Sequence, residues 1–510
     1  MFRSLTNPEL VEIAFQEINA LLHEYAEWLF VSDGVAQSLR RDEIDVAVLQ
    51  RRLMLSCWTE KGTRLWRVVA WEWKEQSLKL EVSRRMGAEV SLIQLIPRTS
   101  AKVITATIRA ARQMRCERLA RLASTLQFGS VVERMSLSRG TKPGQPGRNA
   151  QVLLKTRRER IAVVGPVVSS QPSAVDAFLS SSLLWFRRTS DRVKPPYVEQ
   201  LWLIVSPELL KPLLYRVALL RRSLRDVIKV FTVDKELTLL TPAVCPDKDD
   251  LWRKRLARFP PVAAATASEL SLAIVAEAPE AIDIVHSRHG ETLRYFGLPF
   301  ARVRSLLGRE QVWFGINRAH RQLLDESTAN DCHNLLCDLR EHRSASAIDH
   351  RHAFYRAAPE AWLESLLRRE ITKLDPGLII APLHAQFRTA RGAKLGIRPI
   401  DLLALRQDGR LVVIELKVSE DREHVLQGAD YWRRVEAHRR RGHIARAKLF
   451  GARTIRDEAP LVYLVAPTLR VHIAFQTLAH CISSDIEIYR FDINEDWRSG
   501  VRVMRRKRVN

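Results

Sequence analysis

Two nearly continuous apolar segments, residues 400–405 and 411–418, constrain the fold of this chain more than any other feature. The loop between them contains the sequence Gln-Asp-Gly, which suits a type I turn followed by a glycine in the left-handed conformation. Strands that are apolar throughout are typical of sheets covered by helices on both faces, whereas half-exposed strands alternate apolar and polar residues. The pattern therefore predicts a buried β-hairpin inside a mixed α/β domain.

Three charged residues interrupt these apolar segments: Asp401, Glu415 and Lys417. A three-residue loop places Asp401 directly across from Glu415, and Lys417 shares their face because successive strand residues alternate between faces. Burying such charges is costly unless they are paired or hold a metal ion. Two carboxylates suit Mg²⁺, or Mn²⁺ in its place, and an adjacent ammonium suits the charge that develops on a phosphate under attack. The hairpin therefore predicts a metal site formed by Asp401 and Glu415.

A helix is expected directly after the hairpin, over residues 424–438. Polar side chains recur along it at the spacing of one helix face: His424, Gln427, Tyr431, Arg434 and His438. Apolar residues occupy the opposite face. A polar face turned toward the carboxylates provides hydrogen-bond donors for a scissile phosphate, so we expect this face to border the site.

This part of the chain resembles the PD-(D/E)XK nuclease superfamily, in which an aspartate and a Glu-x-Lys triplet lie on one β-hairpin. The matching residues are Asp401, Glu415 and Lys417, with thirteen residues between Asp401 and Glu415. Pro399 stands one position further from the aspartate than in the usual family pattern. The resemblance covers about residues 358–494 and implies a restriction-endonuclease-like domain at the C-terminal end.

Two further features resemble branches of this superfamily. Gln427 and Tyr431 resemble the QxxxY element of RecB-like nucleases, and residues 400–417 are similar to the catalytic domain of NucS-like endonucleases. The resemblance implies cleavage of DNA that depends on Mg²⁺ or Mn²⁺. It also implies that Lys417 is the catalytic lysine and that Gln427 and Tyr431 orient the substrate.

The family usually carries another metal ligand on a helix before the hairpin. The resemblance therefore implies that Glu364 is a ligand beside Asp401 and Glu415, with Glu360 as the alternative. Three basic residues near the site are expected to contact nucleic acid: Arg398, Arg434 and His438.

The chain also repeats itself. Three pairs of blocks match in the same order: 160–164 with 410–414, 185–188 with 431–434, and 201–234 with 461–494. The last pair aligns without a gap, and both members read as strand, proline-containing turn, helix and strand. The matches predict an internal duplication of roughly 250 residues.

The first copy does not keep the charged residues of the second. In the alignment of the two copies, Gln151, Gly165 and Val167 occupy the positions of the two carboxylates and the lysine. No metal ion can bind to such a set, so we expect a degenerate copy of the nuclease fold that has lost its site. The chain is then a monomeric pseudo-dimer, or it forms a homo-oligomer.

These observations predict five regions: N-terminal helices in 1–48, a β-rich module in 49–105, a degenerate nuclease-like lobe in 106–240, a linker with a second β-rich module in 241–345, and a nuclease domain with a basic tail in 346–510. The N-terminal helices are expected as a pair between about Pro8 and Leu39. Glycines, prolines and charged residues favour linkers at 138–151 and 242–266.

Charge and composition favour a polyanionic partner. The formal net charge is +24, from 82 Lys and Arg against 58 Asp and Glu, and the basic residues are spread along the whole chain. Six scattered cysteines without framework spacing, no apolar N-terminal leader and no membrane-spanning run favour a cytoplasmic protein that does not enter a membrane.

The motifs also limit the alternatives. The sequence contains no Walker A loop and no dinucleotide-binding glycine pattern, so no nucleotide cofactor is expected. Two other functions remain open: an RNA endonuclease that uses the same residues, and a catalytically silent nucleic-acid-binding scaffold. Cleavage that depends on Mg²⁺ excludes the scaffold, and a matched pair of DNA and RNA substrates separates the two nucleases.

Overall fold

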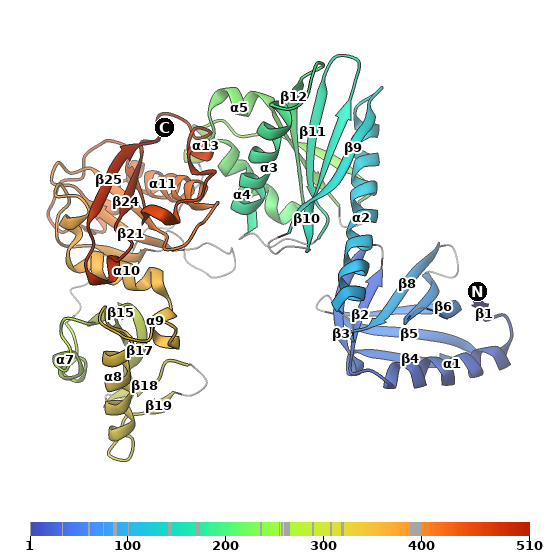
Figure 1. Cartoon of the computed structure of the whole chain (residues 1–510), viewed down its shortest axis with the longest axis horizontal. Coiled ribbons are helices and arrows are strands. Elements are labelled where there is room, and N and C mark those ends of the chain that lie inside the picture. Colours follow the sequence, from blue (N-terminus) through green and yellow to red (C-terminus); the bar gives the residue numbers. More distant parts are fainter. Residues whose placement is uncertain are drawn as a thin grey trace. The chain divides into compact units, whose positions relative to one another are not determined.

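The computed structural model describes residues 2–510 apart from 33, 60–61, 75, 85–88, 100, 141–144, 169–173, 235–236, 254–255, 257–258, 260–265, 288–289, 307–308, 318–320 and 388–398. The chain divides into two compact units. The first comprises Met1–Gln171, Trp185–Lys211 and Val227–Cys245, and the second comprises Pro172–Leu184, Pro212–Asp226 and Pro246–Asn510. Figure 1 shows the elements of both units, and the mixed α/β class expected from the sequence is confirmed.

The first unit begins with an eight-stranded antiparallel sheet in the order β3-β2-β8-β7-β6-β5-β4, with β1 paired to β6. Its strands are β1 (Arg3–Ser4), β2 (Glu27–Ser32), β3 (Val35–Arg40), β4 (Ile44–Leu49), β5 (Arg52–Thr59), β6 (Gly62–Lys74), β7 (Ser77–Arg84) and β8 (Glu89–Pro97). Helix α1 (Pro8–His23) contacts β4 and β5 and buries its apolar face in the core of this sheet.

The sequence predicts two N-terminal helices, and the prediction of the second helix is wrong. Only α1 is helical, and residues 27–40 form the antiparallel hairpin of β2 and β3. The physical reason is the run from Trp28 to Val31, whose bulky and β-branched side chains fill the core of the sheet. Gly34 reverses the chain with a φ of +74°, a conformation that favours glycine.

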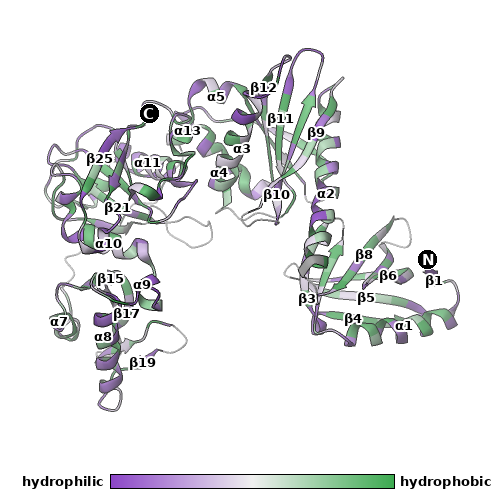
Figure 2. Cartoon of the chain, viewed as in Figure 1, coloured by the Kyte–Doolittle hydropathy of each residue, from purple (hydrophilic) through white to green (hydrophobic). Residues whose placement is uncertain are grey.

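A second sheet in the first unit has six strands in the order β14-β13-β12-β11-β10-β9. The strands are β9 (Val131–Arg139), β10 (Pro146–Lys155), β11 (Arg160–Pro166), β12 (Val198–Val205), β13 (Ile228–Val233) and β14 (Leu240–Ala243). Helix α2 (Ala101–Leu126) packs on β9 and β10. Figure 2 shows hydrophobic residues along β11, and every residue of this strand is buried. The expected linker at 138–151 is therefore wrong, because residues 146–151 pair with β9 as part of β10. The second expected linker, at 242–266, lies partly outside the described residues, and its described part contains the end of β14 and the short helix α6 (Asp250–Arg253).

The second unit contains a five-stranded antiparallel sheet, β15-β16-β17-β18-β19, inside the range where a second β-rich module is expected. Its strands are β15 (Ile282–Ser287), β16 (Gly290–Tyr295), β17 (Leu298–Leu306), β18 (Arg309–Phe314) and β19 (Gln322–Leu323). Helix α7 (Glu269–Ala276) contacts β15 and β16, and α8 (Ala329–His342) contributes buried residues to the same core.

Arg343, just after α8, is fully buried and donates hydrogen bonds to four main-chain carbonyl groups. The acceptors are Tyr295 O (2.9 Å), Phe296 O (2.8 Å), Phe354 O (2.7 Å) and Ala357 O (2.7 Å). Burial, helped by the charge of Arg498, lowers the pKa of Arg343 to about 9. This side chain therefore joins the β-rich sheet to α9 (Ala353–Arg356) and the segment that enters α10 (Pro359–Arg369).

We expect Arg343→Leu to lower the free energy of unfolding by about 3–5 kcal/mol, because four buried carbonyl groups lose a charged donor. Urea denaturation of the full chain, followed by tryptophan fluorescence, measures the shift. Arg340→Leu is the matched control, because Arg340 is an exposed residue on α8 whose side chain donates to one carbonyl, Glu277 O at 2.9 Å. Equal shifts for the two variants contradict this role of Arg343.

The last sheet has six strands in the order β20-β21-β22-β23-β24-β25. These are β20 (His384–Phe387), β21 (Ile400–Leu405), β22 (Leu411–Leu416), β23 (Leu461–Pro467), β24 (Ile488–Ile493) and β25 (Val503–Arg508). Helix α10 shares one core with β21, β22 and β23, and α11 (His424–Arg440) shares a second core with β21 and β22. Because each core lies on its own face of the sheet, the hairpin is buried between helices as the sequence predicts.

The basic C-terminal segment is part of this sheet rather than a tail. Residues 503–508 form β25, which pairs antiparallel with β24. The guanidinium of Arg506 lies over the rings of Tyr463, Tyr489 and Phe491, 5.1–5.6 Å from their centroids. Arg506 thus contacts the aromatic residues beneath this strand, which sequence composition alone does not indicate.

The two six-stranded sheets have the same order and the same directions. In each, an antiparallel hairpin is followed by two parallel strands and a final antiparallel strand. Residues 160–164 lie on β11 and residues 411–414 lie on β22, which has the corresponding place in the order of the second sheet. The repeated blocks therefore occupy corresponding places in two sheets of one topology.

No helix in the described part of the chain is long and apolar enough to cross a membrane.

Candidate active site

The hairpin of β21 and β22 sets the register of the candidate site. Leu402 pairs with Ile414 and Leu405 with Leu411, so Asp401 and Glu415 lie opposite each other at the open end, as the sequence predicts. Gly409 closes the turn with a φ of +84°, and a Cβ there would lie 2.7 Å from the carbonyl oxygen of Thr454. Only glycine fits this turn without strain.

Asp401 is also tied to the opposite strand by a main-chain contact. Its Oδ2 accepts a hydrogen bond of 2.9 Å from the N–H of Leu416. The N–H of Lys417 donates to Val465 O at 3.0 Å, which extends the pairing of β22 with β23. Main-chain contacts therefore fix the strand end that carries Glu415 and Lys417.

Glu415 and Lys417 form a buried ion pair. Their side chains are 2% and 9% exposed, and Lys417 Nζ donates to Glu415 Oε1 at 2.8 Å. Glu415 Oε2 is buried and has no hydrogen-bond partner among the described residues. A buried carboxylate oxygen without a donor costs free energy, and a bound cation removes this cost.

Burial and neighbouring charges shift the pKa values of both Glu415 and Lys417. Burial, and then the charge of Asp401, raise the pKa of the Glu415 carboxyl well above its usual value. Burial by itself lowers the pKa of Lys417, but attraction to Glu415 and Glu360 outweighs it and raises that pKa. Lys417 is therefore an ammonium at neutral pH, suited to stabilise negative charge and not to accept a proton.

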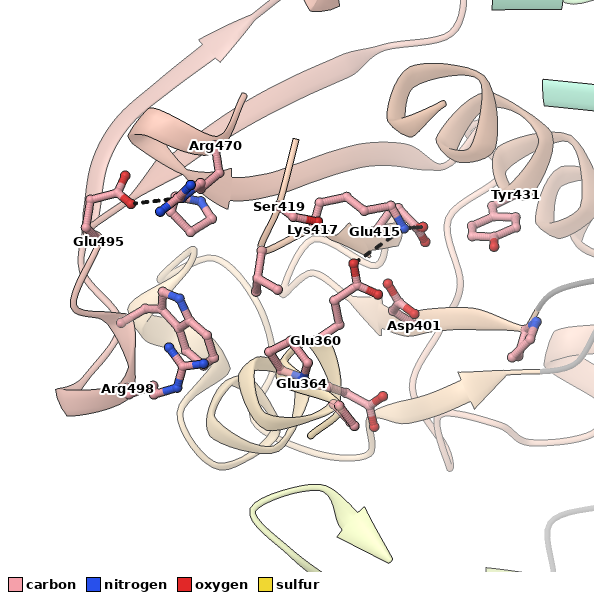
Figure 3. Close-up of a pocket in the computed structure, with 17 residues that line it drawn as sticks. Glu360, Glu364, Asp401, Glu415, Lys417, Ser419, Tyr431, Arg470, Glu495 and Arg498 are labelled. Atoms are coloured by element: carbon pink, nitrogen blue, oxygen red, sulfur yellow. Dashed lines mark hydrogen bonds and ion pairs between the residues drawn. The ribbon is translucent and has the colours of Figure 1, made fainter. Parts of the chain in front are cut away.

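A cavity of about 820 Å³ opens onto these residues. Figure 3 shows Glu360, Glu364, Asp401, Glu415 and Lys417 on one side of it, and Arg470, Arg498 and Glu495 on the other. Charged and aromatic side chains line this cavity, among them Glu360, Glu364, Asp401, Glu415, Lys417, Tyr431, Arg470, Glu495, Trp497 and Arg498.

Helix α10 provides both glutamates that the sequence singles out. Glu364 is 3% exposed and lines the cavity, and its Oε1 lies 3.8 Å from the guanidinium of Arg294 on β16. Glu360 is closer to the lysine, with its Oε1 4.0 Å from Lys417 Nζ. In the part of the chain that the structure describes, no three His, Cys, Asp or Glu side chains are placed together to hold a metal ion. Asp401 and Glu415 are thus the two facing carboxylates, and Glu364 turns toward an arginine.

Helix α11 borders the site only at its first two turns. His424 Nε2 lies 3.2 Å from Glu415 O, and burial, together with the charge of Lys417, lowers the pKa of His424 to about 3. Tyr431 lines the cavity. Gln427 is buried and donates to Glu423 at 3.3 Å, while its own carbonyl oxygen has no partner among the described residues.

Two expected nucleic-acid contacts on α11 are wrong. Arg434 is 8% exposed and pairs with Asp430 at 3.1 Å, and His438 is 1% exposed and stacks on Phe259. Helical spacing gives these residues one face, but neighbouring segments cover that face beyond Tyr431. The third expected contact, Arg398, lies outside the described residues.

The arginine side of the cavity was not anticipated from the sequence. Arg470 and Arg498 lie after β23 and β24, far along the chain from the hairpin. No spacing rule connects them with the Glu-x-Lys triplet. Their positions beyond the ends of two central strands are the only signal, because residues there commonly border a site in open α/β sheets.

The corresponding place in the sheet of β9 to β14 holds no carboxylate among the residues that the structure describes. Gly165 pairs with Ala150 rather than with Gln151, because the loop between β10 and β11 is one residue shorter than its counterpart. The expected equivalence of Gln151 with Asp401 is therefore shifted by one residue. A Cβ on Gly165 would lie 2.4 Å from a side-chain carbon of Leu119 on α2, so a leucine fills this space.

No family model matches the chain, and it has no match among the curated proteins or the solved structures compared with it. The class that fold and site define is a mixed α/β protein whose central hairpin carries an aspartate, a glutamate and a lysine in a cleft.

Proposed function

We propose that this protein is a metal-dependent nuclease of the PD-(D/E)XK type that hydrolyses phosphodiester bonds in DNA. The observation that carries the proposal is the Glu415 carboxylate, buried opposite Asp401 beside Lys417, with one oxygen that has no hydrogen-bond partner among the described residues. A sheet whose antiparallel hairpin continues into two parallel strands, with helices on both faces, supports a restriction-endonuclease-like fold.

The donor set fits a small hard cation. Mg²⁺ typically binds one or two carboxylates and fills its other positions with water and substrate phosphate, so Asp401 and Glu415 suffice to hold it. Glu364 is close enough to line the same cavity and is the candidate third ligand. When bound, the metal ion supplies a Lewis acid and lowers the pKa of a coordinated water.

Charge balance also favours a cation at this place. Glu360, Glu364, Asp401 and Glu415 line the cavity near a single ammonium, Lys417, so a phosphodiester would be repelled from the unaccompanied carboxylates. The Lys417 ammonium stabilises the negative charge that builds up on the phosphate oxygens. Tyr431, at the same wall, orients the substrate. A bound divalent cation removes the repulsion and makes the anionic substrate acceptable.

Cleavage of labelled linear duplex, nicked, branched and single-stranded DNA with Mg²⁺ or Mn²⁺ tests the proposal. Cutting that EDTA abolishes supports it. Cutting confined to a matched RNA moves the assignment to an RNA endonuclease. Tight binding of nucleic acid without cutting of any substrate overturns the nuclease and leaves the scaffold.

The raised pKa of Glu415 predicts a pH-dependent metal requirement. This carboxyl binds a proton more readily than an ordinary glutamate does, so protons compete with Mg²⁺ for it. The Mg²⁺ concentration for half-maximal cleavage should therefore rise by up to about tenfold for each unit of pH below that pKa. Cleavage rates measured against Mg²⁺ at a series of pH values check this.

The same shift has a consequence for stability. A folded-state pKa above the unfolded value makes folding less favourable as the pH rises through the folded pKa, so the metal-free protein should lose stability in that direction. Thermal unfolding in EDTA should show the loss, and added Mg²⁺ should reverse it. Glu415→Gln should remove both effects, and a metal-independent pH profile in the wild type contradicts the assignment.

A further inference from the structure

We propose that Arg498, supported by Arg470, forms a phosphate-binding subsite across the cavity from Asp401, Glu415 and Lys417, and that it holds a backbone phosphate next to the scissile one. The inference rests on the proposed nuclease function and deepens it. It defines the substrate as a polynucleotide with a second phosphate in reach, not an isolated phosphodiester.

Arg498 lies in a short 3-10 turn, Trp497–Ser499, directly after β24. Its guanidinium lies over three aromatic rings, 4.5 Å from the centroid of Tyr355, 5.0 Å from that of Trp362 and 4.3 Å from that of Trp497. Stacking of this kind holds the planar group in one orientation, so little side-chain entropy is lost when it binds an anion.

No carboxylate in the described part of the chain forms an ion pair with this guanidinium, although the charge of Asp496 attracts it. No ion pair or hydrogen bond joins it to a described residue, and its Nε is buried without a hydrogen-bond partner. Burial lowers the pKa of Arg498, which shows that the surroundings disfavour its charge. A half-buried arginine that faces a cavity without a counter-ion is suited to bind an anion from outside the chain.

Arg470 adds charge on the same side of the cavity. It ends the 3-10 turn Thr468–Arg470 after β23, and its Nε lies 3.8 Å from Glu495 Oε2, with both side chains exposed. An exposed pair at this distance is weak, so the positive charge of Arg470 is only partly neutralised. Figure 3 shows Arg470 and Arg498 on the side of the cavity away from Asp401.

The opposite charges of the two sides indicate the ligand class. The acidic side accepts a phosphate only with a cation, whereas the arginine side accepts one directly. Bidentate contact with phosphate is a property of the planar guanidinium. A polynucleotide places phosphates at regular intervals along one chain, so one strand meets both requirements at once.

The test compares wild type with Arg498→Gln, Arg498→Lys, Arg470→Gln and Arg456→Gln. Arg456 is the matched control, because it is a half-exposed arginine paired with Glu458 that does not line the cavity. Binding of a labelled single-stranded DNA oligonucleotide is measured in EDTA over a range of salt concentrations. Cleavage of the same oligonucleotide and of bis(p-nitrophenyl) phosphate, which has one phosphodiester, is measured with Mn²⁺.

We expect Arg498→Gln to weaken oligonucleotide binding about tenfold and to lower the slope of log affinity against log salt by about 0.7, as for one phosphate contact. KM for the oligonucleotide should rise while the rate with bis(p-nitrophenyl) phosphate stays unchanged. Arg470→Gln should have a smaller effect, and Arg456→Gln none. If Arg498→Gln lowers the thermal midpoint of unfolding, Arg498→Lys is compared with wild type in its place. Lysine keeps the positive charge but loses the planar, bidentate donor geometry of the guanidinium.

Wild-type affinity and salt slope in the Arg498→Gln protein overturn the subsite, whether or not cleavage occurs. If the wild type cleaves DNA and Arg498→Gln has the same KM and rate on both substrates, the nuclease assignment stands and the subsite is excluded. Binding that depends on Arg498 without cleavage under any metal keeps the subsite and removes the nuclease. A wild type that neither binds nor cleaves removes both.

Discussion

Asp401→Asn should reduce metal-dependent cleavage by about 10³-fold or more, because the amide removes one of the two facing carboxylates that we propose as ligands of the cation. The substitution is conservative for the fold. Asp401 Oδ2 accepts a hydrogen bond from Leu416 N–H, and the amide oxygen of asparagine can accept the same bond. The loss is therefore expected in the single-turnover rate with saturating Mg²⁺, with an unchanged thermal midpoint in EDTA.

The turn of the same hairpin offers the control for this variant. Asp408 accepts a hydrogen bond from Arg410 N–H, lies 3.2 Å from Arg406 and does not line the cavity. Asp408→Asn makes the same chemical change on the same element and should cleave at the wild-type rate. An Asp401→Asn protein that cleaves within about tenfold of wild type would exclude this aspartate as a metal ligand.

Asp430→Ala should lower the free energy of unfolding by about 3–5 kcal/mol. The Asp430 carboxylate is 5% exposed and faces three arginines: Arg433 at 2.6 Å, Arg434 at 3.1 Å and Arg216 at 3.4 Å. Burial raises the pKa of Asp430, but these charges outweigh it and hold that pKa far below its usual value. Alanine leaves the guanidinium groups buried without this counter-ion.

Urea denaturation of the full chain measures the effect, and Asp457→Ala is the control. Asp457 also contacts an arginine, Arg439, but its side chain is fully exposed, so its loss should cost less than about 1 kcal/mol. The stability that Asp430 contributes should be complete above the pKa of an unfolded aspartate, about 4, and decline as the pH falls below it. Equal costs for the two alanine variants would contradict the buried cluster.

The hairpin was predictable because its information is local. Alternation fixes which residues share a face, and the Gln-Asp-Gly turn fixes the register, so the opposition of Asp401 and Glu415 follows from a few neighbouring residues. The same local rules failed at residues 27–40, where a bulky apolar run forms strands rather than a second helix. Tertiary packing decided that segment, and its partners are distant in sequence.

The errors around α11 have a different cause. Helical spacing identifies a face, but it does not state how much of that face other segments cover. Arg434 and His438 share the face of Tyr431, yet Asp430 and Phe259 enclose them. Arg498 shows the opposite case, a cavity residue that local spacing does not identify. Only the folded sheet brings it to the cavity that the hairpin lines.

Leu119 occupies the space beside Gly165 in the sheet of β9 to β14, so a metal site like the one proposed at Glu415 is difficult to form there. A carboxylate at position 165 would meet packed hydrocarbon, and no cation could reach it until the leucine were also replaced. Each single step back toward a metal site would therefore destabilise the sheet before it restored any chemistry. Selection acting on one substitution at a time would remove such intermediates, so the proposed metal site is expected to stay in one half of the chain.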